Sequence, residues 1–193
     1  MQNNVKIAIT GGIGSGKSAV CEIIKNYGYP VFSCDEIYSE LLNSTEFLKK
    51  IDNEFDGVLN EDGSLNRVAL SDAVFNNETA LKKLNAITHP EIMSAAFKKM
   101  EGYRLAFLEV PLLFENGFES LFDGVIVVLR NLVDRINSVM KRDKLDREQV
   151  LLRINKQFYY ENFDFTKYYV IHNDSNLANL EQKTQEVLLK ILK

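Results

Sequence analysis

The sequence has few cysteines, no long apolar run and no basic N-terminal segment, which are the features typical of exported and membrane proteins. Two cysteines, Cys21 and Cys34, are too few for a disulfide framework and lack the spacing of a metal site. No apolar run approaches the roughly 18–20 residues needed to span a bilayer. The first residues carry no basic segment of the kind that opens a secretory signal. We therefore expect a cytoplasmic protein that is neither exported nor inserted in a membrane.

Positive charge is also scarce. Lys and Arg number 23 against 27 Asp and Glu, which gives a formal net charge of −4. Broad nucleic-acid binding depends on neutralising phosphates with cations, so we expect no nucleic-acid partner, although a local basic patch is compatible with this balance. The length of 193 residues suits one α/β domain that carries an insertion.

The most informative stretch is 5–18, where an apolar run leads into a glycine-rich loop. The run Val5–Thr10 is followed by the sequence GGIGSGKS at 11–18, which satisfies G-x-x-x-x-G-K-[ST]. In this motif backbone N–H groups surround a di- or triphosphate, the lysine supplies charge to the β- and γ-phosphates, and the hydroxyl can ligate Mg²⁺. Apolar residues at helical spacing follow, so the anion would face a helix N-terminus. The loop predicts a bound nucleotide but not a reaction.

Beyond the loop, strands and helices alternate as in a parallel α/β sheet. The predicted strands are 5–10, 29–33, 105–110, 125–129 and 169–171. The predicted helices of this core are one from the loop to Gly28, then 132–141, 147–158 and 177–191. Between 37 and 102 helical periodicity dominates and predicts an inserted helical lobe, in which Pro90 should begin a new helix or kink an existing one.

Two carboxylates follow predicted strands and are candidates for chemistry. In doubly wound sheets the ligand crevice lies outside the carboxyl ends of the strands, and Asp35 and Glu109 follow the second and third strands. Asp35 is the candidate general base, with a plain helix N-cap role as the alternative. Ser18 together with Asp35 or Glu109 could place Mg²⁺.

Other polar and aromatic groups allow more than one interpretation. The basic residues between Arg135 and Arg153 could close over a transferring phosphoryl group or simply form a solvated surface. The aromatic residues Tyr159, Tyr160, Phe163 and Phe165 could stack on a base or pack in a core.

A GTPase switch is an alternative class that the sequence argues against. It would require D-x-x-G after the third strand and N-K-x-D near the end, and neither pattern occurs. The stretch Asn155-Lys156-Gln157-Phe158 lacks the required Asp. Two further alternatives are an ATPase that drives a conformational change and a regulatory nucleotide-binding module. The sequence does not decide between them and a kinase, because partner surfaces cannot be read from it.

Taken together, these residues resemble the dephospho-coenzyme A kinase family over nearly the whole chain. The resemblance includes the loop with Thr10, Asp35 after the second strand, and Leu84 through Thr88-His89-Pro90. It continues through Val110-Pro111-Leu112-Leu113-Phe114-Glu115, Arg135, Lys141-Arg142-Asp143, and Arg153 with Gln157. The His-Pro and Pro-Leu-Leu-Phe-Glu elements are more specific than the loop, which many kinases share.

The resemblance implies a three-layer P-loop kinase fold with a central parallel sheet. It implies a single domain, 1–193, with a nucleotide-binding core at 1–36 and 103–193, a helical acceptor-binding insertion at 37–102 and lid helices at 131–158. The implied reaction is ATP-dependent phosphorylation of the ribose 3′-hydroxyl of dephospho-coenzyme A, which yields coenzyme A and ADP with Mg²⁺ as the metal. The runner-up is another small-molecule kinase with the same loop, such as a nucleoside or nucleotide kinase.

The resemblance also implies roles for individual residues. The catalytic residues would be Asp35, Lys17 and Arg142, and the metal would contact Ser18 and Glu109. The acceptor would contact Asp35, His89, Pro111 and Leu112. The nucleotide would contact Gly11, Gly12, Ile13, Gly14, Ser15, Gly16, Lys17, Ser18, Ala19 and Asn173, with the Ala19 amide at the α-phosphate and Asn173 near adenine.

Two positions depart from the family pattern. Glu109 stands where the family usually has Asp, which adds a methylene to any contact made there. Tyr168-Tyr169 stand where Ala-Asp is common before the last strand, which affects the expected base pocket. The sequence does not predict the oligomeric state.

Overall fold

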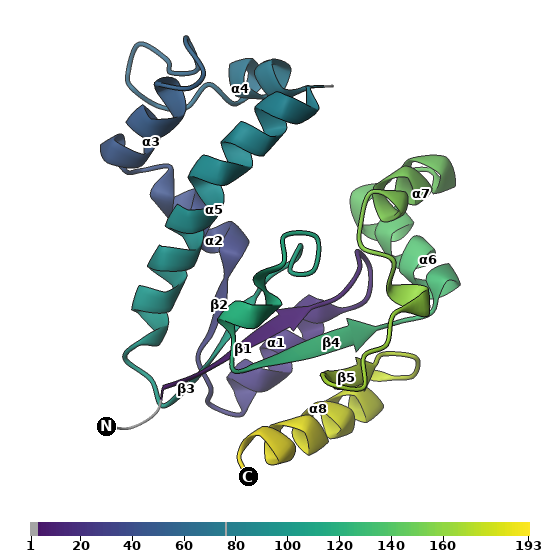
Figure 1. Cartoon of the computed structure of the whole chain (residues 1–193). Helices are drawn as coiled ribbons and strands as arrows, with labels where there is room; N and C mark the ends of the chain where they lie inside the picture. The colour runs from purple at the N-terminus through teal and green to yellow at the C-terminus, as the bar shows by residue number, and fades with distance from the viewer. Residues whose placement is uncertain (1–3, 76) are drawn as a thin grey trace. The chain divides into compact units, whose positions relative to one another are not determined.

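The computed structural model describes residues 4–75 and 77–193, which form two compact units (Figure 1). The first unit consists of Met1–Phe32 and Tyr103–Lys193, and the second of Ser33–Gly102. Each unit buries a hydrophobic core made of its own residues. The first unit is built on a sheet, whereas the second is mainly helical.

The sheet has five strands in the order β2-β3-β1-β4-β5. Its strands are β1 (Val5–Thr10), β2 (Val31–Ser33), β3 (Leu105–Glu109), β4 (Gly124–Leu129) and β5 (Tyr169–His172). β1 runs parallel to both β3 and β4, and β4 runs parallel to β5. Parallel sheets are covered on both faces, which is why these strands are nearly continuous apolar runs. The predicted α/β class with a central parallel sheet is confirmed.

Two helices, α1 (Lys17–Asn26) and α8 (Leu177–Ile191), cover one face of the sheet (Figure 1). Alternate strand residues point to this face because side chains alternate along a strand. The strand residues in this core are Ile7, Ile9, Phe107, Ile126, Val128 and Ile171, and the helix residues include Val20, Ile24, Leu180 and Val187. This packing fixes the start of α1, and with it the end of the glycine-rich loop.

The end of α1 follows the sequence prediction. Gly28 has φ of 85°, its N–H donates to the Lys25 carbonyl at 2.8 Å, and the Tyr29 N–H donates to the Ile24 carbonyl at 3.3 Å. These two bonds form a Schellman motif, which satisfies helix carbonyls that would otherwise lack partners. Gly28 is therefore the C-terminal cap that the sequence predicts.

A helix pair, α6 (Leu132–Asp143) and α7 (Arg147–Asn155), follows β4. Both helices begin at side-chain caps, from Asn131 and from an Asp146–Gln149 capping box. The prediction that α7 runs to Phe158 is wrong. The helix ends at Asn155, and the Phe158 N–H donates to Glu115 Oε1 at 2.7 Å instead of continuing the helix. Two short 3₁₀ turns, η1 (Phe118–Leu121) and η2 (Tyr160–Asn162), complete this unit.

The second unit contains α2 (Cys34–Leu41), α3 (Thr45–Asp52), α4 (Arg67–Val74) and α5 (Glu78–Met100). Its core includes Phe47, Ile51 and Phe55, against which Leu84 and Ile87 of α5 pack. α3, α4 and α5 each have a capping side chain, from Ser44, Asn66 and Asn77. In the described part of this unit the only β pairing is the isolated bridge between Leu59 and Leu65.

Helix α5 continues through Pro90. The alternative in which Pro90 begins a new helix is therefore wrong. An internal proline costs about 3 kcal/mol because it removes a hydrogen bond and crowds the preceding turn. α5 packs against α2, α3 and α4, and burial along its length offsets that cost.

Within 4–75 and 77–193, none of the helices combines the length and the apolar character that crossing a membrane would need.

Candidate nucleotide-binding and catalytic site

The glycine-rich loop connects β1 to α1 at the centre of the sheet. α1 begins at Lys17, and Gly16 occupies its N-cap position with φ of 96° and ψ of 23°. The Ser15 N–H donates to the Gly12 carbonyl at 3.1 Å, which curls the loop back on itself. A loop that ends at a helix N-terminus directs free N–H groups and the positive end of the helix dipole toward one point, which suits an anion.

Close neighbours surround the glycines of the loop. A Cβ at Gly16 would collide with the side-chain amide of Asn173, and the positive φ at this position disfavours any other residue. A Cβ at Gly12 would collide with the guanidinium of Arg135. The loop is therefore enclosed from behind by side chains that lie far away in the sequence.

Asn173 follows β5 and holds the loop backbone. Its Nδ2 donates to the Ser15 carbonyl at 2.9 Å, and its own N–H donates to the Leu129 carbonyl at 2.8 Å. This contact ties the end of the last strand to the loop. The adenine contact inferred from the resemblance stays a prediction.

Lys17 folds back over the loop. Its Nζ donates to the Gly11 carbonyl at 2.7 Å and approaches the Gly12 carbonyl at 3.4 Å. Burial lowers the pKa of Lys17, while the charge of Glu109 acts in the opposite direction. A buried ammonium with neutral oxygen partners is well suited to accept a phosphate oxygen as a further partner.

The other loop residues differ in exposure and bonding. Ser15 is 1% exposed, and its Oγ has no hydrogen-bond partner among the described residues. Ser18 is exposed at the start of α1. The Ala19 N–H donates to the Gly16 carbonyl at 3.1 Å, so its inferred contact with an α-phosphate would share or replace that bond.

Ile13 at the tip of the loop is bound by the region around α6 and α7. Its N–H donates to Gln157 Oε1 at 2.7 Å, and its carbonyl accepts from Arg135 Nε at 3.0 Å. Arg135 also donates from Nη1 to Glu161 Oε1 at 2.8 Å. Arg135 is 3% exposed, so the solvated-surface interpretation of the basic helices is wrong for this residue.

Behind the loop lies a cavity of about 180 Å³. It is lined by Gly12, Ser15, Val128, Leu129, Arg130, Arg135, Tyr160 and Glu161. Tyr160 lies with its hydroxyl 3.4 Å from Thr10 Oγ1, and burial raises the pKa of Tyr160 to about 12. Glu161 could not be predicted as a neighbour of the loop, because the chain returns to the loop through an irregular segment whose path cannot be read from periodicity.

Glu109 lies at the carboxyl end of β3, as predicted, and pairs in register with Ile9. Cys21 Sγ lies 3.8 Å from Glu109 Oε2. Burial, followed by the charge of Glu109, raises the pKa of the Cys21 thiol, so this cysteine stays protonated. Glu109 thus lies next to the first helical turns after the loop.

Arg142 lies near the end of α6 in an exposed ion-pair network. Its Nε and Nη2 donate to the two carboxylate oxygens of Asp143 at 2.7 and 3.2 Å, and Arg153 Nη1 donates to the same carboxylate at 3.2 Å. The hydrogen bond to Asp143 raises the pKa of Arg142. Lys144, with φ of 55°, then ends the helix. The network pairs the guanidinium with Asp143 at the junction of the two helices, where the side chains of Arg142 and Arg153 are exposed.

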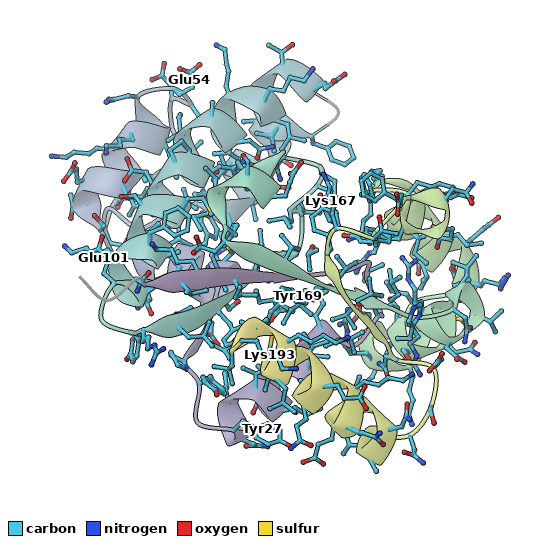
Figure 2. All side chains as sticks on the ribbon, turned by 60° about the horizontal axis from the view of Figure 1, so that its bottom comes forward. Tyr27, Glu54, Glu101, Lys167, Tyr169 and Lys193 are labelled. Carbon is cyan, nitrogen blue, oxygen red and sulfur yellow. The ribbon has the colours of Figure 1, made fainter. Side chains whose placement is uncertain are left out.

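The aromatic residues after α7 pack on one another. Phe114 lies 4.9 Å from Phe158 and 5.6 Å from Phe163 between ring centroids, and Phe158 lies 5.3 Å from Tyr160. Phe165 and Tyr168 belong to the same cluster, and Lys167 (Figure 2) lies 5.1 Å from the centroid of the Tyr168 ring. The core-packing interpretation therefore holds for Tyr160 and Phe165, whereas Phe163 packs on the cluster but is 39% exposed. Tyr159, 64% exposed, lies outside the cluster.

The segment after β3 leads into this aromatic cluster. Pro111 is partly exposed and Leu112 is 44% exposed, whereas Leu113 is fully buried. Glu115 of the same segment accepts the Phe158 N–H. The acceptor contacts inferred for Pro111 and Leu112 stay predictions, and the structure shows that both side chains are reachable from solvent.

Asp35 and His89 belong to the second unit. Asp35 lies in the first turn of α2, whose N-cap is Ser33, so the alternative that Asp35 is the N-cap is wrong. Its side chain is exposed. His89 is partly buried on α5, and this burial lowers its pKa. Their roles toward the acceptor stay predictions.

The fold and the loop define a class of protein. The central strand of the parallel sheet leads through a glycine-rich loop into a helix that begins with the lysine and serine of the motif. This arrangement is a P-loop nucleotide-binding fold of the kinase type. No group of three or more His, Cys, Asp or Glu residues that could hold a metal ion occurs in the part of the chain described.

Comparison with known proteins gives the family. The family model "Dephospho-CoA kinase" matches residues 5–179. A curated dephospho-CoA kinase from Thermus thermophilus is 37% identical over 188 residues, which are 96% of this chain and 91% of that protein. The chain therefore belongs to the dephospho-CoA kinase family.

Solved structures agree with this assignment. TT1252 from Thermus thermophilus superposes with a TM-score of 0.84 at 34% identity and covers 98% of both chains. A dephospho-CoA kinase from Campylobacter jejuni superposes with a TM-score of 0.69 at 30% identity, over 98% of this chain and 97% of that one. The predicted P-loop kinase fold and family are confirmed.

Proposed function

We propose that the protein transfers the γ-phosphoryl group of ATP to the ribose 3′-hydroxyl of dephospho-CoA, forming CoA and ADP in the last step of coenzyme A biosynthesis. The observation that carries this proposal is the phosphate loop between β1 and α1, in a chain that matches the dephospho-CoA kinase family over nearly its full length. The enzyme is thus a phosphotransferase that acts on an alcohol.

The residues present suit ATP. The loop backbone is held by hydrogen bonds from Asn173 and Arg135, and within 4–75 and 77–193 the buried Ser15 hydroxyl has no hydrogen-bond partner. In the bound state the loop amides and Lys17 would hold the phosphates. Lys17 needs only a small movement of Nζ from the Gly11 carbonyl, because the ammonium already lies over the loop.

The residues present also suit Mg²⁺. Mg²⁺ sites of this kind use one or two protein oxygens together with phosphate oxygens and water, rather than a full protein cage. Ser18 and Glu109 are the residues that would hold it, since Ser18 is exposed and Glu109 ends the neighbouring strand β3. Bound Mg²⁺ neutralises charge on the β- and γ-phosphates during transfer.

The acceptor side of the proposal rests on the second unit, on the general base Asp35 and on the positive charge of Arg142. We assign the acceptor to the helical segment 37–102 and the role of general base to Asp35, whose exposed carboxylate follows β2 by two residues. His89, Pro111 and Leu112 contact the acceptor in this proposal. The helices 131–158 act as a lid that brings Arg142 toward the phosphates, and its guanidinium stabilises the transferring charge.

The test is an assay of ADP release with Mg²⁺ and ATP. Dephospho-CoA, adenosine and nucleoside monophosphates are compared as acceptors, and product mass is checked for one added phosphoryl group. Stimulation by dephospho-CoA with formation of CoA is the expected result. Stimulation by a nucleoside or a nucleoside monophosphate instead would keep the loop assignment and overturn the acceptor. ATP binding without turnover would indicate a nucleotide-binding regulator.

We further propose that the protein works in the cytoplasm with small molecules and without a nucleic-acid partner. The net charge of −4 supports the absence of a nucleic-acid partner. Cell fractionation with immunodetection tests the location.

A further inference from the structure

Ile13 is held by the α6–α7 region through both its backbone and its side chain. Both polar groups of its backbone are bound, the N–H by Gln157 and the carbonyl by Arg135. Its side chain packs against the apolar cluster of Ile136, Val139 and Val150 between α6 and α7. One loop residue is thus held by two hydrogen bonds and a hydrophobic contact from a part of the chain more than a hundred residues away.

Arg135 makes this contact with a buried charge. A buried guanidinium is stable only when its donors are paired, and here Nε donates to Ile13 and Nη1 to Glu161. Its Nη2 lies where a Cβ of Gly12 would be. The donors are therefore directed at the back of the loop and at Glu161, in contrast to the exposed guanidinium of Arg142.

A glycine-rich loop needs such support, because glycines leave the backbone many conformations. Gly11, Gly14 and Gly16 all have positive φ, and ordering them costs more entropy than ordering other residues. Phosphate binding requires one arrangement of the amides, so any loop disorder in the free protein lowers the affinity by the fraction of time spent elsewhere.

We propose that Arg135 and Gln157 are positioning residues that clamp Ile13 and hold the phosphate loop ready for ATP. The clamp acts on the loop, so it applies to nucleotide binding with or without an acceptor. The clamp also separates the helix pair proposed as a lid into a fixed end and a movable end. The end that carries Arg135 and Gln157 stays fixed to the loop, and only the junction around Arg142 and Lys144 is left to move.

The clamp rests on the proposed function only in that the bound nucleotide is ATP. Its test uses Gln157→Met, which keeps the length of the side chain and removes the acceptor oxygen. Loss of this partly buried hydrogen bond corresponds to about a tenfold change in an equilibrium constant. We therefore expect ATP affinity, measured by calorimetry on the full chain, to fall about tenfold, with the affinity for dephospho-CoA unchanged.

The control is Gln182→Met, the same substitution on the exposed face of α8, where Gln182 Nε2 donates to Glu186 Oε1 at 3.0 Å. It should leave ATP affinity unchanged. Arg135→Lys is a second variant that keeps the positive charge but cannot pair with both Ile13 and Glu161 in the same geometry, and it should weaken ATP in the same direction.

Hydrogen exchange separates positioning from general stability. In the nucleotide-free protein, exchange at the Ile13 amide should be about tenfold faster in Gln157→Met, while the amides of β1 and β4 keep their protection. Unchanged ATP affinity together with unchanged exchange at Ile13 would overturn the clamp. If wild-type protein binds ATP but fails to phosphorylate dephospho-CoA, the proposed acceptor is wrong, and the clamp is still judged by ATP binding and exchange.

Discussion

At the scale of single residues, Lys17 combines two demands that oppose each other. Its ammonium is largely removed from water, which lowers its pKa, yet it must stay charged to attract phosphate. The Gly11 carbonyl at 2.7 Å stabilises the charge without neutralising it. The ammonium that would meet the phosphate is therefore already partly removed from water in the free protein, which strengthens its attraction for phosphate.

Replacing Lys17 tests this directly. Lys17→Ala removes a charge-assisted contact worth about 1.5–3 kcal/mol, so ATP affinity should fall by about 10- to 100-fold, and turnover should fall with it. Calorimetry and a steady-state assay measure the two effects. Lys25→Ala is the matched control, because Lys25 lies on the same helix, is exposed and pairs with Glu22. Full activity with unchanged ATP affinity in Lys17→Ala would contradict the phosphate role.

Replacing Asp35 should lower turnover without lowering ATP affinity, whereas replacing Lys17 should lower both. A positioned general base contributes about 10²–10⁴-fold to rate, so Asp35→Asn should lower kcat by that factor while ATP affinity stays close to normal. Glu36→Gln is the control, since Glu36 is the other carboxylate in the first turn of α2 and is also exposed. If Asp35→Asn turns over at a near-normal rate, the base is another group.

Tyr160 gives a prediction for alkaline pH. Burial raises the pKa of Tyr160 to about 12, above the ordinary value of about 10. Because the folded protein holds the neutral phenol more tightly than the unfolded chain does, its contribution to stability is complete below about pH 10 and is lost as the pH rises toward 12. Burial raises the pKa of Tyr38 as well, so ultraviolet titration of phenolate should show a late component that becomes smaller in Tyr160→Phe. A late component that is unchanged in Tyr160→Phe would assign it to another tyrosine.

At the scale of elements, the strands could be predicted from the sequence more accurately than the ends of the helices. Strands β1, β3, β4 and β5 were predictable because buried parallel strands leave continuous apolar runs. The end of α1 was predictable because Gly28 has a local signature. The end of α7 was not, because the competing partner of the Phe158 N–H is Glu115, more than forty residues earlier.

The same reasoning explains which parts of the site could be predicted. The loop itself follows from a local motif whose spacing has a mechanical meaning. The burial of Arg135 does not follow, because its partners Ile13 and Glu161 come from other parts of the chain and charged helix residues usually face water. The surface interpretation of a basic helix therefore failed where tertiary contacts outweigh local composition.

The cap of α1 predicts an effect on stability without an effect on activity. Gly28→Ala places a side chain at φ of 85° and should lower the free energy of unfolding by about 1 kcal/mol. Gly102→Ala is the control. A Cβ has open space at both glycines, but only Gly28 has positive φ. Chemical denaturation measures both, and equal stability of the two variants would show that the cap geometry carries no strain.

At the scale of the whole molecule, the residues of the candidate site are distributed over two units with separate cores. The phosphate loop, Glu109 and the clamp on Ile13 belong to the first unit, whereas Asp35 and His89 belong to the second. Ligands that bind to one unit should stabilise that unit first, because binding shifts the opening equilibrium of the structure it contacts.

This division gives a prediction that hydrogen exchange can check segment by segment. A non-hydrolysable ATP analogue with Mg²⁺ should protect amides in 11–19, and dephospho-CoA alone should protect amides within 33–102. Adenosine serves as a control that shares the nucleoside of both ligands but lacks their phosphates and the pantetheine arm. Protection by dephospho-CoA that is confined to Met1–Phe32 and Tyr103–Lys193 would remove the second unit as the acceptor site, while leaving the phosphate loop as the site of ATP.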